Sequence, residues 1–247
     1  MTRQPYLSLN LNAFNAGRPT ADLLVQTIAD QVDSVRQVSG CRRYACWSAR
    51  YGFGILEDDW GSDMLSFSEF RPSLRARGGE NVFYMNSFTK KFLPSLRLGY
   101  IVGNAETVPA LLWSKQVSVL STPLLMEAAL FEFLDRGYYE VHLKHLHANL
   151  DRQYQDCLDL LRQFMPDGVQ WTSPGGGPIL WLEMPQGVPT QPVKEDLAKQ
   201  NIFLNDFDRA FLGKAHLHGF RICYSNLPPE DLEYGIEKLA ASIRKNM

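Results

Sequence analysis

The chain has 247 residues, of which 45% are hydrophobic and 12% aromatic, and its formal net charge is -2. This length suffices for one large or two modest globular domains. The near-neutral charge provides no basic face, so we expect no nucleic-acid partner for this chain. No run of about 18 apolar residues predicts a membrane helix, and the opening MTRQPYLSLN lacks the pattern of a secretion signal. Four scattered cysteines fit a reduced, cytoplasmic protein.

The first 47 residues carry the weakest pattern. Weak alternation predicts a strand over residues 6–11, and a turn follows at Asn15 to Pro19. Thr20 is placed to cap a helix that has Leu23, Leu24, Ile28 and Val32 on one face. Residues 41–47 fit no regular period.

From Tyr51 onward the pattern is clearer. Phe53 to Leu56 predicts a short buried strand, which ends in the carboxylates Glu57, Asp58 and Asp59. After a polar stretch over 61–80, a second strand begins at Val82 and breaks at Ser87-Phe88-Thr89-Lys90, and another is expected over Leu96 to Val102. Open α/β sheets bind ligands just past the carboxyl ends of their strands. The hydroxyls of Ser87 and Thr89 and the guanidinium of Arg97 suit a phosphate there.

The remainder predicts helices and then a small α+β unit. Helices are predicted over residues 106–119, 123–134, 138–164 and 191–199, and a last one from Pro229. In 138–164 apolar residues recur at steps of three and four, namely Leu143, Leu146, Leu150, Tyr154, Cys157, Leu161 and Phe164. Short alternating or apolar runs predict strands over 169–172, 179–182, 202–204 and 220–224. The long helix 138–164 fits a connector between two domains.

The segment S-F-T-K-x(3)-P-x-x-R-x-G-Y at residues 87–100 resembles the cofactor-lysine segment of pyridoxal-phosphate enzymes of the aspartate aminotransferase superfamily, fold type I, class I and II. Within it, the chain is most similar to the aminotransferase-type domain of the MocR/GabR regulators, which belong to the GntR family. The resemblance implies a three-layer α/β fold with a mostly parallel sheet and a small C-terminal α+β domain. We expect an incomplete large domain at 1–147 and the small domain at 148–247, because the family's N-terminal arm and early strands have no counterpart here.

The resemblance assigns Lys90 as the lysine that forms the Schiff base with pyridoxal 5'-phosphate. Lys91 is its rival, and without the resemblance both are an ordinary surface pair. Asp58 corresponds to the carboxylate that keeps the cofactor's ring nitrogen protonated, although Glu57, Asp58 and Asp59 could all be solvated charges at a strand end. Ser87 and Arg97 correspond to phosphate ligands.

Three further residues complete the expected site. Trp60 stands where the family usually has a tyrosine that contacts the cofactor's phenolic oxygen, and an indole donates but does not accept. Arg221 resembles the arginine that binds the substrate carboxylate; an outward-facing arginine on an edge strand is equally compatible with the pattern. Asn15 is a weaker match to a cofactor-contacting asparagine. The five histidines do not recur with carboxylates or cysteines at ligand spacing, so we expect no metal site.

The sequence therefore predicts a pyridoxal-phosphate-dependent aminotransferase-type domain that acts on amino acids and 2-oxo acids. By resemblance it forms a homodimer, and it needs no membrane. Two alternatives stay open. The chain could be an effector-sensing domain of a MocR/GabR-like transcriptional regulator without its DNA-binding part, or an inactive fragment that binds no cofactor.

Overall fold

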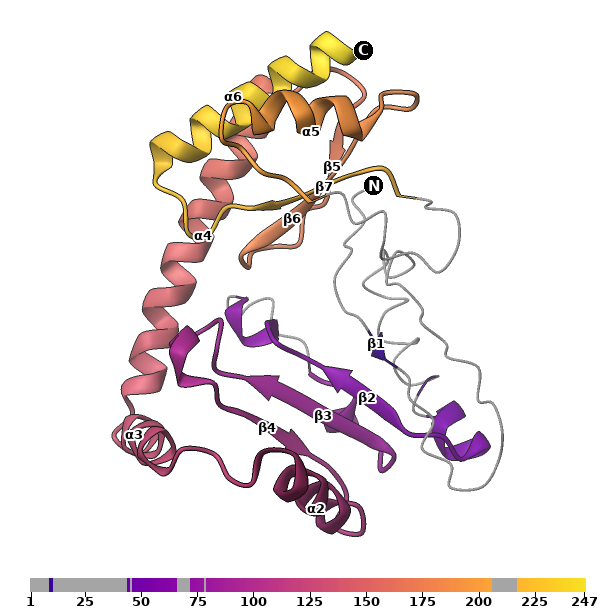
Figure 1. The fold of residues 1–247 in the computed structure, drawn as a ribbon, viewed down its shortest axis with the longest axis vertical. Helices are drawn as coiled ribbons and strands as arrows, with labels where there is room; N and C mark the ends of the chain where they lie inside the picture. Colours follow the sequence, from indigo (N-terminus) through magenta and orange to yellow (C-terminus); the bar gives the residue numbers. More distant parts are fainter. Residues whose placement is uncertain (1–8, 11–43, 45, 66–71, 78, 206–216) are drawn as a thin grey trace. The chain divides into compact units, whose positions relative to one another are not determined.

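The computed structural model describes residues 9–10, 44, 46–65, 72–77, 79–205 and 217–247. The chain divides into two compact units, one reaching to Leu146 and the other running from His147 to Met247, and each is described by itself. Figure 1 shows a sheet with helices in each unit, which confirms the predicted α/β class. The described residues do not include Asn15, the helix expected from Thr20, or most of the segment 41–47. Among the helices described, none is long and apolar enough to cross a membrane.

The first unit contains a four-stranded sheet. Its strands are β1 (Leu9–Asn10), β2 (Ile55–Asp58), β3 (Val82–Ser87) and β4 (Gly99–Val102), and they lie in the order β1-β2-β3-β4. Of the three strand pairs described in this sheet, only β2 with β3 is parallel. Those two strands therefore end at the same edge of the sheet.

Alternation along β2 and β3 sorts their side chains between the two faces of the sheet. Ile55 and Val82 are fully buried and pack with Leu74 into a small core, against which Tyr44 and Phe53 also pack. Since β-strand side chains alternate, Glu57 lies on the face of Ile55, whereas Asp58 points to the opposite face. This alternation decides which carboxylate is available at the end of β2.

The segment between β3 and β4 corrects one prediction. The strand expected over Leu96 to Val102 begins only at Gly99, because Pro94–Leu96 forms a single 3-10 turn and Arg97 adopts a left-handed backbone with φ 52°. Proline at the start of a helical turn fits its fixed φ. At Gly99 a Cβ atom would lie 2.7 Å from the backbone oxygen of Asn86, so the close approach of β3 and β4 requires glycine there.

Two helices follow β4 in the same unit, α2 (Val108–Val119) and α3 (Leu124–Asp135). The predicted helices are confirmed, but their expected apolar core face is only partly realised. No residue of α2 is buried, and Leu130 is the buried residue of α3. Leu112, Trp113 and Val117 are each more than half exposed.

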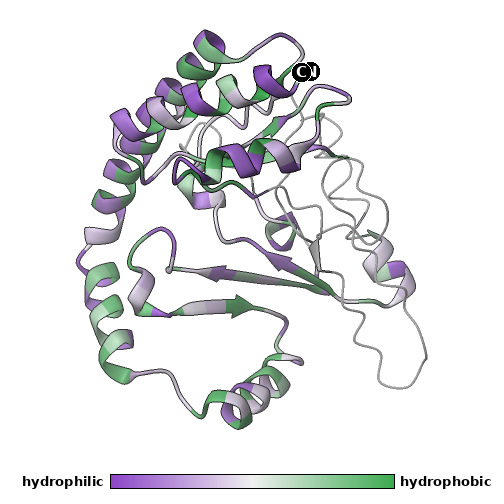
Figure 2. Cartoon of the chain, turned by 45° about the horizontal axis from the view of Figure 1, so that its top comes forward, coloured by the Kyte–Doolittle hydropathy of each residue, from purple (hydrophilic) through white to green (hydrophobic). Residues whose placement is uncertain are grey.

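The long helix α4 (Tyr138–Phe164) has 27 residues and is confirmed at the predicted bounds within one residue. At 1.5 Å per residue it is about 40 Å long. Its apolar stripe is the predicted one: Leu143, Leu150, Tyr154, Cys157 and Leu161 are all buried. Figure 2 shows this helix with both polar and apolar positions along its length, as an amphipathic helix requires.

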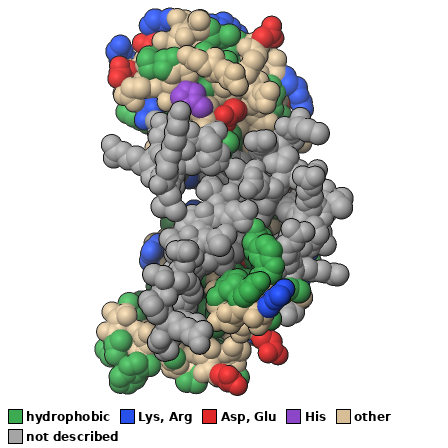
Figure 3. Space-filling view, turned by 90° about the vertical axis from the view of Figure 1, so that its right-hand side faces the viewer, with side chains coloured by type: hydrophobic (Ala, Val, Ile, Leu, Met, Phe, Trp, Pro, Cys, Tyr) green, Lys and Arg blue, Asp and Glu red, His purple; other side chains and the backbone are tan. Residues whose placement is uncertain are grey.

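The second unit is a three-stranded antiparallel sheet covered by helices. Its elements are β5 (Gln170–Trp171), β6 (Ile179–Glu183), β7 (Gly219–Cys223), α5 (Thr190–Ala198) and α6 (Pro229–Asn246). Leu182, Phe220, Val193, Leu197 and Ile243 are fully buried in one core with the C-terminal half of α4. Charged side chains are spread over the face of this unit that is seen at the top of Figure 3.

One predicted strand of the second unit is wrong. Residues 202–204 form no strand; Asn201 has a left-handed backbone with φ 60°, and only Asn205 makes an isolated bridge, to Arg221. The turn after α5 takes up the residues that the apolar pattern had assigned to a strand. Without forming a strand, Ile202 and Leu204 still pack against the core of the unit.

Candidate active site

The carboxyl ends of β2 and β3 bring together the residues that the sequence singled out. In the parallel register Asp58 lies opposite Met85, so Asp58 and Ser87 share one face of the sheet. Ordinary strand spacing and rise put their Cα atoms roughly 8 Å apart. Trp60 and Lys90 follow directly after these strand ends, and the Lys90 Nζ lies 3.7 Å from the centre of the Trp60 ring.

The three consecutive carboxylates Glu57, Asp58 and Asp59 have different surroundings in the structure. Glu57 is buried, and its two oxygens accept hydrogen bonds from the backbone N–H groups of Leu74 and Arg75 at 2.9 and 3.2 Å. Burial is the main cause that raises the pKa of Glu57, against those two hydrogen bonds. Glu57 therefore holds the chain segment around Leu74 in place and is not available to a ligand.

Asp59 is buried as well and organises the turn that follows β2. It accepts hydrogen bonds from the Ser62 backbone at 2.9 Å and from the Tyr84 hydroxyl at 2.9 Å, and from the Ser62 hydroxyl. Asp58 is only half-buried and makes no hydrogen bond or ion pair with a residue that the structure describes. Of the three carboxylates, Asp58 alone has an oxygen pair left for a bound molecule.

The same contrast separates the two adjacent lysines. Lys90 is exposed, and within the described part of the chain its amine has the Trp60 indole as its partner and no carboxylate. Lys91 is 2% exposed; its amine donates to the Asn86 Oδ1 at 2.7 Å and pairs with Asp63. Only the Lys90 amine is accessible to an aldehyde, because Lys91 would have to leave a buried ion pair.

Ser87, Thr89 and Arg97 lie around the same turn. The Phe88 N–H donates to the Leu98 carbonyl at 3.1 Å, which brings residues 87–88 beside 97–99. The Thr89 backbone N–H donates to the Ser87 hydroxyl at 3.1 Å. Arg97 is exposed, and its guanidinium makes no hydrogen bond or ion pair with the described residues. A hydroxyl, a guanidinium and exposed backbone near an amine are the groups that a phosphate ester binds.

Two of the expected site residues are not among the described residues of the first unit. Arg221 lies on β7 of the second unit, is half-buried, and donates its backbone N–H to the Asn205 carbonyl at 3.1 Å. Asn15 lies outside the described residues. The roles of both stay predictions.

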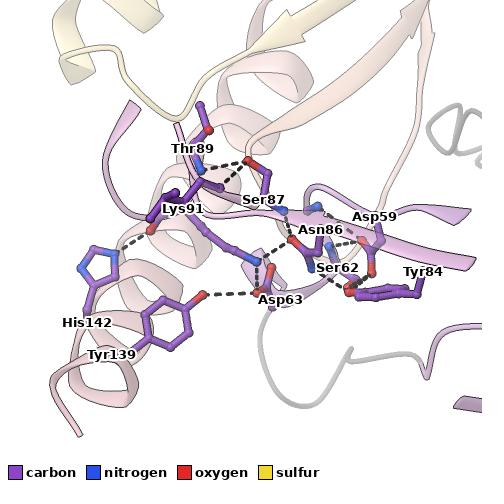
Figure 4. Close-up of polar contacts among 12 residues, drawn as sticks. Asp59, Ser62, Asp63, Tyr84, Asn86, Ser87, Thr89, Lys91, Tyr139 and His142 are labelled. Atoms are coloured by element: carbon purple, nitrogen blue, oxygen red, sulfur yellow. Dashed lines mark hydrogen bonds and ion pairs between the residues drawn. The ribbon is translucent and has the colours of Figure 1, made fainter. Parts of the chain in front are cut away.

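A polar network that was not predicted from the sequence lies on the opposite face of the sheet from Asp58. Figure 4 shows it: the Asn86 amide lies between the Tyr84 hydroxyl, to which it donates at 2.6 Å, and the Lys91 amine. The Tyr139 hydroxyl of α4 donates to Asp63 at 3.4 Å. Burial raises the pKa of both tyrosines, so their hydroxyls stay protonated and donate to the neighbouring carboxylates.

A signal for this network was present in the chain. Val82, Tyr84 and Asn86 alternate on one face of β3, and a buried Val82 at the start of that row predicts that the two polar residues are buried too. Buried polar side chains require partners. Asp59, Asp63 and Lys91, which are close in sequence to the two strand ends, are the charged residues within reach.

Comparison with known proteins gives a consistent result. A family model for aminotransferase class I and II matches residues 60–239, a range that includes Lys90, Arg97 and Arg221. Aromatic-amino-acid aminotransferase 1 of Thermococcus litoralis is 26% identical over 201 residues, which are 81% of this chain and 48% of that protein. The HTH-type transcriptional regulator TauR of Rhodobacter capsulatus is 28% identical over 198 residues, 78% of this chain and 40% of the regulator.

A solved structure shows the same fold. The alpha-aminoadipate aminotransferase LysN of Thermus thermophilus, complexed with N-(5'-phosphopyridoxyl)-L-leucine, superimposes with a TM-score of 0.77 at 24% identity, over 84% of this chain and 54% of that one. The chain thus spans about half the length of the relatives that it matches. Because the family model covers well over half of the residues, this chain belongs to the aminotransferase class I and II family.

Proposed function

We propose that this chain is a pyridoxal-phosphate-dependent aminotransferase-type domain that transfers the amino group between amino acids and 2-oxo acids. The observation that carries the proposal is the contrast between Lys90 and Lys91. The Lys90 amine has no carboxylate partner among the described residues and lies against Trp60, two positions after Asp58, whose carboxylate is also unpaired among them, at the carboxyl edge of β2 and β3. That is the edge at which α/β sheets bind their ligands.

The residues present fit the proposed cofactor. Pyridoxal phosphate combines an aldehyde, a basic ring nitrogen and a phosphate, and this edge offers an amine, a carboxylate and a cation with a hydroxyl. A ligand that binds here would break no ion pair between described residues, because none is formed by Lys90, Asp58 or Arg97. Ser87 keeps its hydroxyl at the strand end, where it accepts from the Thr89 backbone. The donor set matches the chemical groups of the ligand one for one.

Each residue has a defined task in this proposal. When bound, pyridoxal phosphate supplies an aldehyde that condenses with amines and a ring that withdraws electrons from the substrate's Cα. Lys90 would hold the aldehyde carbon and would move the proton at the substrate's Cα. Asp58 would accept a hydrogen bond from the ring nitrogen. Ser87 and Arg97 would hold the phosphate, and a guanidinium can do so with two parallel hydrogen bonds.

Trp60 and Arg221 complete the set, and Asn15 stays a candidate contact to the cofactor. The Trp60 indole lies against the Lys90 amine and can donate, but not accept, one hydrogen bond. Arg221 binds the substrate carboxylate. We also propose the division into a cofactor-binding part at 1–147 and a small domain at 148–247, and assembly as a homodimer.

The decisive experiment measures cofactor attachment and turnover separately. The protein is incubated with pyridoxal phosphate, reduced with borohydride and digested, and mass spectrometry locates the added phosphopyridoxyl group. We expect the group on Lys90, its loss in Lys90→Ala, and its retention in the matched control Lys115→Ala, which alters an exposed lysine of α2. Release of 2-oxo acids from a panel of amino acids then tests transamination. Label on Lys91, or label that persists in Lys90→Ala, would refute the assignment.

A second candidate function is ligand sensing, which the similarity to TauR favours. A sensing domain would attach pyridoxal phosphate at Lys90 and react with its effector amino acid once, without sustained release of a 2-oxo acid. An inactive fragment would attach none. The same two measurements therefore distinguish the enzyme, the sensor and the fragment.

A further inference from the structure

Lys91 is a buried cation to which the proposed function gives no task. Its side chain runs from the turn after β3 toward the turn after β2, where the amine meets Asn86 and Asp63 (Figure 4). Only 2% of the residue is exposed. An ammonium in such a place is tolerated only when it is paired and hydrogen-bonded, so Lys91 strongly favours this one arrangement.

The contacts of Lys91 connect three elements of the first unit. Asn86, the acceptor at 2.7 Å, belongs to β3, and Asp63 belongs to the 3-10 turn Ser62–Met64 that follows β2. Helix α4 makes two contacts with this group: His142 Nε2 lies 2.6 Å from the Lys91 backbone oxygen, and the Tyr139 hydroxyl donates to Asp63. Both the side chain and the backbone of residue 91 are therefore fixed.

Lys90 has no such anchor of its own. Its backbone is in the turn between Ser87 and Phe92, and its side chain is exposed with the Trp60 ring as its contact. Since residues 90 and 91 are adjacent, the anchoring of residue 91 limits where the Lys90 Cα can lie. Trp60 is limited in the same way, because Asp59 and Asp63 on either side of it belong to the network.

We propose that Lys91 is a positioning residue: its ion pair with Asp63 and its hydrogen bond to Asn86 fix the turn so that the Lys90 amine lies against Trp60. The inference rests on the proposed function, in which this amine receives the cofactor. Lys91 acts through Lys90 and does not touch the ligand.

The test uses the contact between Lys90 and Trp60 as a reporter, without any cofactor. Trace acetic anhydride labels the amines of the folded protein, and mass spectrometry gives the labelling of Lys90 relative to the exposed Lys115. The indole covers the amine, so Trp60→Leu should speed Lys90 labelling about threefold, the size of an exposed cation–π contact. In Lys91→Met the amine has already left the indole, and Trp60→Leu should then change the labelling little.

Matched variants separate positioning from general damage. Lys144→Met removes an exposed lysine of α4 and should leave the full effect of Trp60→Leu. Asp63→Asn removes the ion pair but keeps an acceptor for Lys91, so it should reduce the effect of Trp60→Leu on Lys90 labelling. If circular dichroism shows that Lys91→Met is unfolded, Asp63→Asn replaces it in the comparison. A Trp60 effect that persists without the Lys91–Asp63 pair, or that is absent from the parent protein, would overturn the proposal.

Cofactor attachment provides the second readout. Borohydride trapping on Lys90 should fall several-fold in Lys91→Met and stay unchanged in Lys144→Met. If the parent protein attaches no pyridoxal phosphate, the proposed function fails, while the labelling comparison still decides the role of Lys91. If the parent protein attaches the cofactor, but Trp60→Leu changes the labelling of Lys90 equally with and without Lys91, the positioning role is refuted and the proposed function stands.

Discussion

Glu57, Asp58 and Asp59 have the same charge at consecutive positions, yet each has different surroundings. Alternation along β2 buries Glu57 on the face of Ile55, where two backbone N–H groups bind it. The chain turns immediately afterwards, so the buried Asp59 accepts hydrogen bonds from two half-buried residues, Ser62 and Tyr84. Asp58 points to the other face, and its oxygens accept no hydrogen bond from a described residue. A shift of β2 by one residue would turn Glu57 to the face of Asp58 and Asp58 to the buried face, because side chains alternate between the two faces of a strand.

Glu57→Gln tests the structural role of the first carboxylate. The amide nitrogen would face the N–H of Leu74 or Arg75, and one unsatisfied buried group costs about 1–3 kcal/mol. Because burial raises the pKa of Glu57 in the folded state, the folded protein binds the proton more tightly than the unfolded chain. The stability that Glu57 contributes is therefore complete below its unfolded pKa of about 4.5 and declines as the pH rises through the raised value.

The measurement is urea unfolding of the parent protein and the variant at several pH values. The stability of the parent relative to Glu57→Gln should be largest below pH 4.5 and should decrease as the pH rises above it. Glu80→Gln, the same substitution at an exposed glutamate of the same unit, should show no such trend. A difference between parent and Glu57→Gln that is independent of pH would contradict the argument.

At the scale of elements, the strands of the second unit depend on one glycine. Gly219 begins β7 opposite Glu183, and a Cβ atom there would lie 1.9 Å from the backbone oxygen of Leu182. Backbone cannot move aside as a flexible side chain can. Gly219→Ala should destabilise the unit by about 3 kcal/mol or more, at or above the upper end of overpacking costs, and it should also displace Arg221 on the same strand.

Gly235 is the matched control in the same unit. It lies within α6, and nothing within 4 Å would meet an added Cβ atom. Gly235→Ala should stabilise the protein by about 0.5–1 kcal/mol, since alanine favours a helix interior over glycine. Thermal unfolding of both variants checks the pair. If Gly219→Ala melted with the parent, the β6–β7 spacing in the structure would be wrong.

The sequence predicted those elements whose pattern is local and long. Helix α4 was predictable because a strong apolar stripe over 27 residues specifies both its type and its buried face. The strand expected from Leu96 failed because the contact that sets its start, Gly99 against Asn86, is not local. Residues 202–204 failed because three apolar residues suit a strand and a packed turn equally.

The site was predictable to a different extent. The motif favoured Lys90 over Lys91 by resemblance, and the structure adds the physical reason, since Lys91 is buried in an ion pair. The network around Asn86 could not be derived from spacing alone, because it joins residues 59–63, 84–91 and 139–142 from three elements. Only the alternation of Val82, Tyr84 and Asn86 gave a hint of it.

At the scale of the whole molecule, the two units differ in what they expose. The second unit buries the inner faces of α5 and α6 in one core. The first unit leaves large apolar side chains uncovered: every residue of β4 is exposed, as are Leu112, Trp113 and Val117 of α2 and Leu124 of α3. In Figure 3 apolar side chains gather at the lower end, the end at which α2 lies in Figure 1. Contiguous exposed apolar surface usually marks an interface.

We therefore expect the isolated chain to self-associate through the first unit. Trp113→Glu with Val117→Lys replaces two exposed apolar residues by an i,i+4 ion pair, which itself favours the helix. This variant should shift sedimentation toward the monomer without lowering the melting temperature, because α2 has no buried residue to lose. Gln191→Glu with Glu195→Lys places the same ion pair on α5 and should leave association unchanged. A parent chain that stays monomeric at high concentration would show that this surface does not serve as a self-interface.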